Sequence, residues 1–116
     1  MPDKLDVKKI KKYLKLEENQ CPVERAMRIL GGKWKASILF HLKEQPLRFN
    51  ELSRQLPGAS KKILNQRLQE MEELGFVKRT VKAAKPIAVE YSTTPAGVEA
   101  LSALDGVRDW AAKHNI

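Results

Sequence analysis

The chain has 116 residues, the length of one ordinary domain, which leaves no room for a second. Apolar residues make up 42% of it, enough for a hydrophobic core, and no apolar run approaches the roughly 18 residues of a membrane-spanning helix. A single cysteine, Cys21, excludes an intrachain disulfide and a cysteine-cluster zinc site. We therefore expect a small soluble protein of the cytoplasm, without a membrane association.

Basic residues outnumber acidic ones, and the excess is unevenly distributed. The chain carries 22 Lys and Arg against 14 Asp and Glu, for a net charge of +8. Residues 95–116, by contrast, hold two basic and three acidic residues. A positive excess favours a polyanionic partner, most simply a nucleic acid. We expect the mildly acidic C-terminal stretch to serve another purpose.

The first part of the chain has the pattern of three helices. Within an N-terminal extension, residues 1–20, apolar side chains recur at helical spacing among lysines over 5–16. Pro22 suits the first position of a second helix, which ends at the glycine pair 31–32. The apolar stripe of a third helix, which ends before Pro46, consists of Trp34, Ile38, Leu39 and Leu42.

Residues 47–74 have the pattern of a helix-turn-helix. Residues 47–49 could form a short strand, and the brief helical pattern over 50–56 ends at a Pro-Gly turn. Ser60 can cap the helix that follows by accepting a hydrogen bond from its first turn. The core face of this second helix, which ends at Gly75, consists of Ile63, Leu64, Leu68, Met71 and Leu74.

After Gly75 the apolar period changes from that of a helix towards that of a strand. Residues 76–81 and 87–92 are rich in β-branched and aromatic residues, so a hairpin is expected over 76–92. A final helix is expected over 95–115. A hairpin that follows a helix-turn-helix is the wing of a winged helix. The predicted fold is therefore mainly α with a small β-hairpin (α+β): one winged helix-turn-helix domain.

The start of the helix after Ser60 has the chemistry of a DNA-binding surface. Lysines in a first turn oppose the helix dipole, but together with the free N–H groups they suit a phosphate. Asn65 and Gln66 can pair with adenine edges, and Arg67 with guanine or phosphate. An ordinary solvated face is the alternative. The residues expected to contact DNA are Ser60, Lys61, Lys62, Asn65, Gln66 and Arg67 from the helix, and Arg79, Lys82 and Lys85 from the wing.

Several segments, in this order and spacing, resemble one known family. They are CPV at 21–23, GGKW at 31–34, RFNEL at 48–52, SKKILNQRL at 60–68, ELGFVKR at 73–79, VEYSTTPAG at 89–97 and DW at 109–110. Together they resemble the HxlR-type winged-helix transcription regulators, relatives of the MarR group. The resemblance implies a bacterial or archaeal double-stranded DNA-binding regulator, usually a homodimer, that represses or activates nearby genes.

The terminal helices offer a surface for a second chain. A domain of this size cannot readily bury both the apolar stripe of the last helix and the apolar face of the N-terminal extension. Packing against the same helices of a second copy would cover both. The alternative is that Trp110 packs inside its own domain. The residues expected in the dimer interface are Ile10, Tyr13, Leu14, Leu101, Leu104, Val107 and Trp110.

Cys21 is a candidate sensor. The resemblance implies it, since some members of this family sense oxidants or electrophiles through a cysteine at this position. The positive end of the helix that starts at Pro22 favours a thiolate, an effect that Arg25 would support and Glu24 would oppose. The alternative is a small buried side chain, the usual state of a lone cytoplasmic cysteine. The effector, whether an oxidant or a small molecule, is not identified by the sequence.

Catalysis has little support in the sequence. The two histidines, His41 and His114, fit no Ser-His-Asp order and no metal-ligand spacing. We therefore expect no enzymatic activity, no cofactor and no metal site. The alternative function is a winged-helix module that binds RNA or protein without sequence-specific DNA binding, because a fold does not fix a function.

Overall fold

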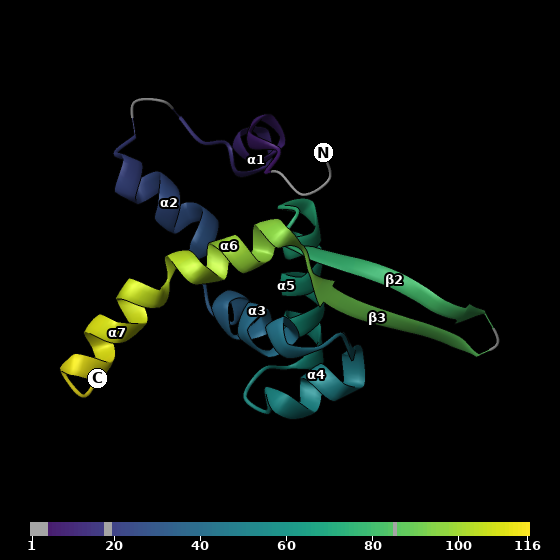
Figure 1. Cartoon of the computed structure of the whole chain (residues 1–116). Coiled ribbons are helices and arrows are strands. Elements are labelled where there is room, and N and C mark those ends of the chain that lie inside the picture. The colour runs from purple at the N-terminus through teal and green to yellow at the C-terminus, as the bar shows by residue number, and fades with distance from the viewer. Residues whose placement is uncertain (1–4, 18–19, 85) are drawn as a thin grey trace.

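The computed structural model describes residues 5–17, 20–84 and 86–116, with the side chains of 83 and 84 excepted. Its elements in chain order are α1 (Val7–Leu14), α2 (Pro22–Leu30), α3 (Lys35–Glu44), β1 (Leu47–Arg48), α4 (Phe49–Gln55), α5 (Lys61–Glu73), β2 (Val77–Ala84), β3 (Ile87–Thr93), α6 (Pro95–Ala103) and α7 (Asp105–Lys113). The β2–β3 hairpin extends from one side of the helical body, and α7 lies on the opposite side (Figure 1). The predicted winged helix-turn-helix is confirmed: α4 and α5 form the helix-turn-helix, and the hairpin forms the wing.

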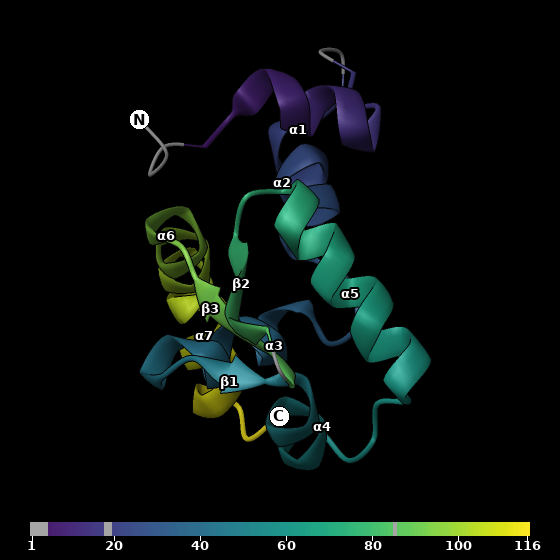
Figure 2. The ribbon, with the colours of Figure 1, turned by 90° about the vertical axis from the view of Figure 1, so that its right-hand side faces the viewer.

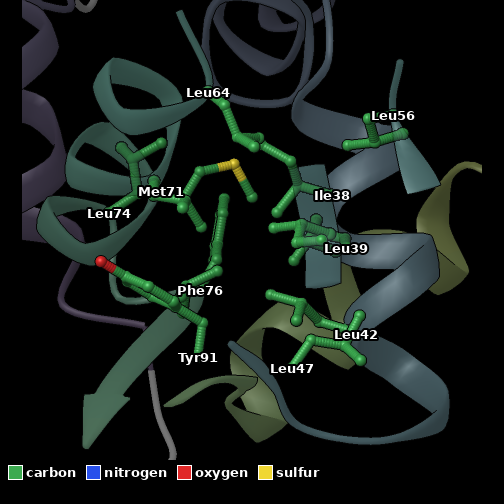
Figure 3. Close-up of a cluster of buried hydrophobic side chains, with 14 of the residues drawn as sticks. Ile38, Leu39, Leu42, Leu47, Leu56, Leu64, Met71, Leu74, Phe76 and Tyr91 are labelled. Carbon is green, nitrogen blue, oxygen red and sulfur yellow. The ribbon is translucent and has the colours of Figure 1, made fainter. Parts of the chain in front are cut away.

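The hydrophobic core lies where α3, α4, α5 and the sheet meet. Phe76, which follows α5 directly, is 2% exposed. In Figure 3 its ring lies between Met71 of α5 and Ile38 of α3, both of which are fully buried. Burying such apolar side chains is the main favourable contribution to folding, and it fixes how α5 sits on α3. The outer side of α5 is thereby left to solvent.

The sheet has three strands, and the prediction of a two-stranded hairpin was incomplete. β1 pairs antiparallel with β3, so that the strand order is β1-β3-β2. Leu47 lies opposite Tyr91, and both side chains are buried. At this position the Leu47 side chain reaches the core, and pairing with β3 provides hydrogen-bond partners for the backbone groups of β1. Phe49, which the sequence placed with this strand, instead begins α4.

The C-terminal region is two helices, so the prediction of one helix over 95–115 was wrong. At Leu104 the backbone N–H donates to the Leu101 carbonyl, three residues back, at 3.0 Å. This tighter turn interrupts the α-helical pattern, and α7 begins at Asp105 in a new direction (Figure 1). An acidic residue suits a first helical position, and Gly106 disfavours an uninterrupted helix.

Thr94 and Gly97 fix the start of α6 against the core. The Thr94 hydroxyl donates to the Gly75 carbonyl at 2.6 Å and accepts from the Gly97 N–H at 3.0 Å. Gly97 lies so close to the Phe76 carbonyl that a Cβ atom at this position would collide with it. The absence of a side chain at Gly97 therefore lets α6 pack directly on the chain that links α5 to the wing.

The N-terminal helix α1 lies beside the end of α5 from which the chain continues into β2 (Figure 2). The Asp6 side chain caps α1 by accepting from the Lys9 N–H at 3.1 Å. Ile10 anchors the helix, since only 4% of it is exposed. Arg28 of α2 donates to the Leu14 carbonyl at 2.9 Å, which ties the end of α1 to α2.

Candidate nucleic-acid interface

The first turn of α5 is capped and exposed. The Ser60 hydroxyl accepts from the Ile63 N–H at 3.1 Å, as the sequence predicted. Lys61 and Lys62 follow on the surface, while Leu64, one turn later, is fully buried. The cap uses the Ser60 oxygen as an acceptor and leaves the hydroxyl hydrogen free to donate to an anion. Free backbone N–H groups and two ammonium groups therefore face the same solvent.

One side of α5 carries polar groups along its whole length. Lys62, Gln66, Gln69 and Glu73 follow each other at spacings of three and four residues, and all four are on the surface. Asn65 is exposed beside them. Of the residues expected to contact DNA from this helix, the structure brings Lys61, Lys62, Asn65 and Gln66 together on one accessible surface.

Arg67 lies at the edge of this surface. Its Nε donates to the Lys33 carbonyl at 3.2 Å, and its Nη1 lies 3.7 Å from Oε2 of Glu70. The side chain is only 29% exposed. Arg67 thus points toward the loop between α2 and α3, and its guanidinium would have to leave these partners to reach a base. This engagement was not anticipated from the sequence.

A buried ion pair lies behind Arg67. Lys35, in the first turn of α3, is 6% exposed, and its Nζ lies 3.0 Å from Oε1 of Glu70. Glu70 thus holds cations from two helices, α3 and α5. Sequence reasoning missed this pair, although a signal was present: Lys35 shares a helical face with the apolar Ile38 and Leu42 and therefore points inward.

The turn of the helix-turn-helix is covered by Trp34. This residue has a left-handed backbone, with φ of 79°, at the N-cap of α3. A Cβ atom at Gly58, in the turn between α4 and α5, would lie 3.0 Å from the Trp34 indole. Lys33 lies over the indole ring, with its Nζ 5.3 Å from the ring centroid. The loop before α3 therefore packs on the turn between α4 and α5 and helps to fix the orientation of α5 relative to α3.

The wing carries exposed cations on β2. Arg79 and Lys82 are both exposed, and the Lys82 Nζ lies 3.8 Å from Oε1 of Glu90 across the hairpin. The strand register shifts between Val81 and Ala83, so Lys82 sits at a β-bulge, which turns a side chain away from the regular pleat. Lys85, also expected to contact DNA, lies outside the described residues.

The residues expected at the dimer interface fall into two groups. Ile10 is buried in the core of its own chain, and Leu14, Leu101 and Leu104 are half-buried. Tyr13, Val107 and Trp110 are exposed, the last two at 59% each. The alternative that Trp110 packs inside its own domain is therefore wrong for the single chain: its ring lies on the surface, near His114, at 5.6 Å between centroids.

Tyr13 borders the acidic end of α5. Desolvation raises the pKa of its phenol above the ordinary value of 10.0, and the Glu70 and Glu73 charges raise this pKa further. Both causes favour the protonated, neutral phenol. Tyr13 is therefore a neutral hydrogen-bonding group at physiological pH.

Cys21 is exposed at the N-cap of α2, so the alternative of a buried cysteine is wrong. Its backbone is extended, and Pro22 occupies the first helical position, as predicted. The Cys21 thiol is thus open to a reagent from solvent.

Two further observations concern metals and membranes. In the part of the chain that the structure describes, His, Cys, Asp and Glu side chains form no group of three that could hold a metal ion. Across residues 5–17, 20–84 and 86–116, no helix combines the length and the apolar character needed to cross a membrane.

The fold and this surface define a winged helix-turn-helix protein. The family model described as HxlR-like helix-turn-helix matches residues 29–115. The chain therefore belongs to the HxlR-like helix-turn-helix family of transcriptional regulators, which confirms the resemblance seen in its sequence.

Known relatives agree in sequence and in structure. The chain is 37% identical, over 94 residues, to an uncharacterized HTH-type transcriptional regulator of Methanothermobacter thermautotrophicus, a match that covers 81% of this chain and 72% of that protein. The crystal structure of the HTH-type transcriptional regulator YtcD matches with a TM-score of 0.76 and 37% identity, over 82% of this chain and 97% of that one. The redox regulator HypR, solved in its oxidized form, matches with a TM-score of 0.73 and 34% identity, over 80% and 96% of the two chains.

Proposed function

We propose that this protein is a homodimeric regulator that binds a pseudo-palindromic operator in double-stranded DNA. In this proposal α5 enters the major groove, Lys61 and Lys62 bind phosphates, and Asn65 and Gln66 contact base edges. The observation that carries the proposal is the exposed polar side of α5, whose Ser60-capped first turn holds two lysines. Arg67 joins the interface if DNA displaces it from the Lys33 carbonyl.

The wing supports the interaction from the side. Arg79 and Lys82, together with Lys85 from the sequence, bind the flanking backbone or minor groove. Among the described residues, Lys82 pairs with Glu90 at 3.8 Å, and such largely exposed ion pairs contribute little to stability. A phosphate can therefore take the place of the Glu90 carboxylate without a large loss of stability.

A second copy of the chain completes the regulator. Val107 and Trp110 of α7, and Tyr13 of α1, are exposed side chains with apolar surface that a covering partner would stabilise. Two-fold symmetry then places the two α5 helices on half-sites about 34 Å apart, or a multiple of that spacing. The same symmetry accounts for a palindromic target.

Selection of bound fragments from genomic DNA tests this function directly. We expect enrichment of a palindrome that the purified protein prefers over random duplex by about 10³-fold or more at fixed salt concentration. The alternative function, a module for RNA or protein, predicts no enriched palindrome and a loss of nearly all duplex binding as salt rises. In either case the protein acts in the cytoplasm by binding, without catalysis, a cofactor or a metal.

We also propose that Cys21 makes the regulator responsive to oxidants. The exposed thiol and the similarity to a redox regulator support this proposal. Two Cys21 thiols, one from each subunit, would lose two protons and two electrons to an oxidant such as diamide and form one intersubunit disulfide; a mixed disulfide or alkylation are the other outputs that a single cysteine allows. A Cys21→Ser protein should bind DNA normally and no longer respond to diamide. An unchanged response in that variant would reject the proposal.

A further inference from the structure

The N-terminal helix α1 carries a concentration of lysines that stability does not explain. Lys8 and Lys12, four residues apart on one side of the helix, repel each other, and Lys11 and the C-cap residue Lys15 add two more lysines nearby. All four side chains are exposed. A helix built only for packing would alternate charges at this spacing, so this pattern indicates a polyanionic partner outside the chain.

The position of α1 places its lysines beside α5, the helix proposed to bind DNA. Lys9 Nζ lies 3.7 Å from Oε2 of Glu73, so α1 sits at the far end of the polar side of α5. A polar hollow of about 640 Å³ lies between the two helices; Tyr13, Gln66 and Gln69 line it together with Lys9, Arg67 and three glutamates of α5. A large ligand that binds at Gln66 from solvent would therefore also lie next to α1.

The dimensions of α5 and of DNA bring a phosphate backbone to α1. A helix of 13 residues is about 20 Å long, whereas the major groove is about 12 Å wide. The end of α5 therefore leaves the groove where one strand's phosphates run. Glu72 and Glu73 lie at that end of α5 and would repel the phosphates. A phosphate backbone at this end of α5 therefore needs cations from another element. Lys9 of α1 already lies beside Glu73.

We infer that α1 is a further DNA-contacting element, besides α5 and the wing, in which Lys8 and Lys12 bind backbone phosphates beside the end of α5. The inference rests on the proposed function, since it takes α5 as the helix that enters the groove. Ile10 and the hydrogen bond from Arg28 to the Leu14 carbonyl keep α1 in place. Phosphate binding by α1 adds affinity and sets orientation, but it carries no sequence information.

The test compares two double variants with the same net charge. Lys8→Ala with Lys12→Ala removes the two ammonium groups inferred to bind phosphate. Lys43→Ala with Lys113→Ala removes two exposed lysines from α3 and α7, helices to which the proposed function gives no DNA contact. Alanine favours helix, so both variants should keep the far-ultraviolet circular dichroism of the wild type. The measurement is the affinity for an arbitrary duplex of roughly three helical turns over a range of salt concentrations.

We expect the slope of log K against log salt to become shallower by about 0.9 for each phosphate that the α1 variant no longer binds, and to stay unchanged in the control. The preference for a selected operator over random duplex should stay the same in both. Equal slopes for the two variants, or an α1 variant whose only defect is weaker dimerisation in analytical ultracentrifugation, would overturn the inference. A wild-type chain that binds no duplex at all would instead overturn the proposed function.

Discussion

The ammonium group of Lys35 lies 3.0 Å from the carboxylate of Glu70, and this pair joins α3 to α5, the helix proposed to enter DNA. The Lys35 side chain is 8% exposed and that of Glu70 is 21% exposed. The second oxygen of Glu70 lies 3.7 Å from the Arg67 guanidinium. One carboxylate thus offsets two cations at the back of α5, and the helix cannot rotate or slide without separating these charges.

We predict that Lys35→Met destabilises the fold by about 3 kcal/mol, because breaking a buried pair leaves the remaining charge without its main partner. Because Arg67 remains near the Glu70 carboxylate in this variant, the loss of folding free energy should lie at the lower end of the range for buried pairs. Lys9→Ala is the matched control, since it breaks the half-exposed pair with Glu73 and should change stability by less than about 1 kcal/mol. Urea denaturation gives both values, and equal midpoints would contradict the prediction.

Tyr13 should make stability fall at alkaline pH. Partial desolvation of its phenol raises the pKa above the ordinary value of 10.0, and the Glu70 and Glu73 carboxylates raise this pKa further. The folded state therefore keeps this proton to a higher pH than the unfolded state. Its contribution is fully present below the unfolded pKa of about 10 and is lost as the pH rises through the folded pKa. Tyr13→Phe should flatten the alkaline limb of the urea-stability profile; parallel profiles for both proteins would contradict this account.

Two glycines in successive helices should respond in opposite directions to the same substitution. A Cβ atom at Gly97 collides with the Phe76 carbonyl, so Gly97→Ala should destabilise the fold by about 1–3 kcal/mol. A Cβ atom at Gly106 meets nothing within 4 Å among the described residues, so Gly106→Ala should stabilise it by about 0.5–1 kcal/mol. Thermal denaturation of the two variants measures both signs. A stabilising Gly97→Ala would show that α6 can move away from the core at little cost.

Local signals in the sequence were enough to predict the helix-turn-helix and the wing. Ser60 occupies the N-cap that its residue type suggested, and the change of apolar period after Gly75 marks the start of the wing. Both signals depend on residues that are close together in the sequence, so they can be recognised without knowing the tertiary structure. The same pattern predicted the solvent-facing side of α5, because four of the five residues assigned to its core side are buried and only Ile63 is half-exposed.

Long-range interactions account for what the sequence did not predict. β1 pairs with a strand about forty residues later, and Arg67 bonds to a carbonyl 34 residues earlier. The apolar stripe of the C-terminal region continues across Leu104, so its spacing could not reveal the break between α6 and α7. Ile10 illustrates the same limit: its spacing identified an apolar face but not that its own chain would cover it.

Gln66→Ala and Lys82→Ala should separate base recognition from phosphate binding. Gln66 is exposed in the middle of the polar side of α5, so its loss should weaken the selected operator by about 1–3 kcal/mol and leave random duplex almost unchanged. The Lys82 variant, altered on the wing, should bind all sequences more weakly to the same extent, with a salt slope flatter by about one. Gln69→Ala, one turn farther along the same side, is the matched control for Gln66, because it removes the same amide nearer the acidic end of α5. Fluorescence anisotropy on operator and random duplex at several salt concentrations measures each effect. If Gln66→Ala and Lys82→Ala changed both duplexes equally, α5 would not be the helix that reads the sequence.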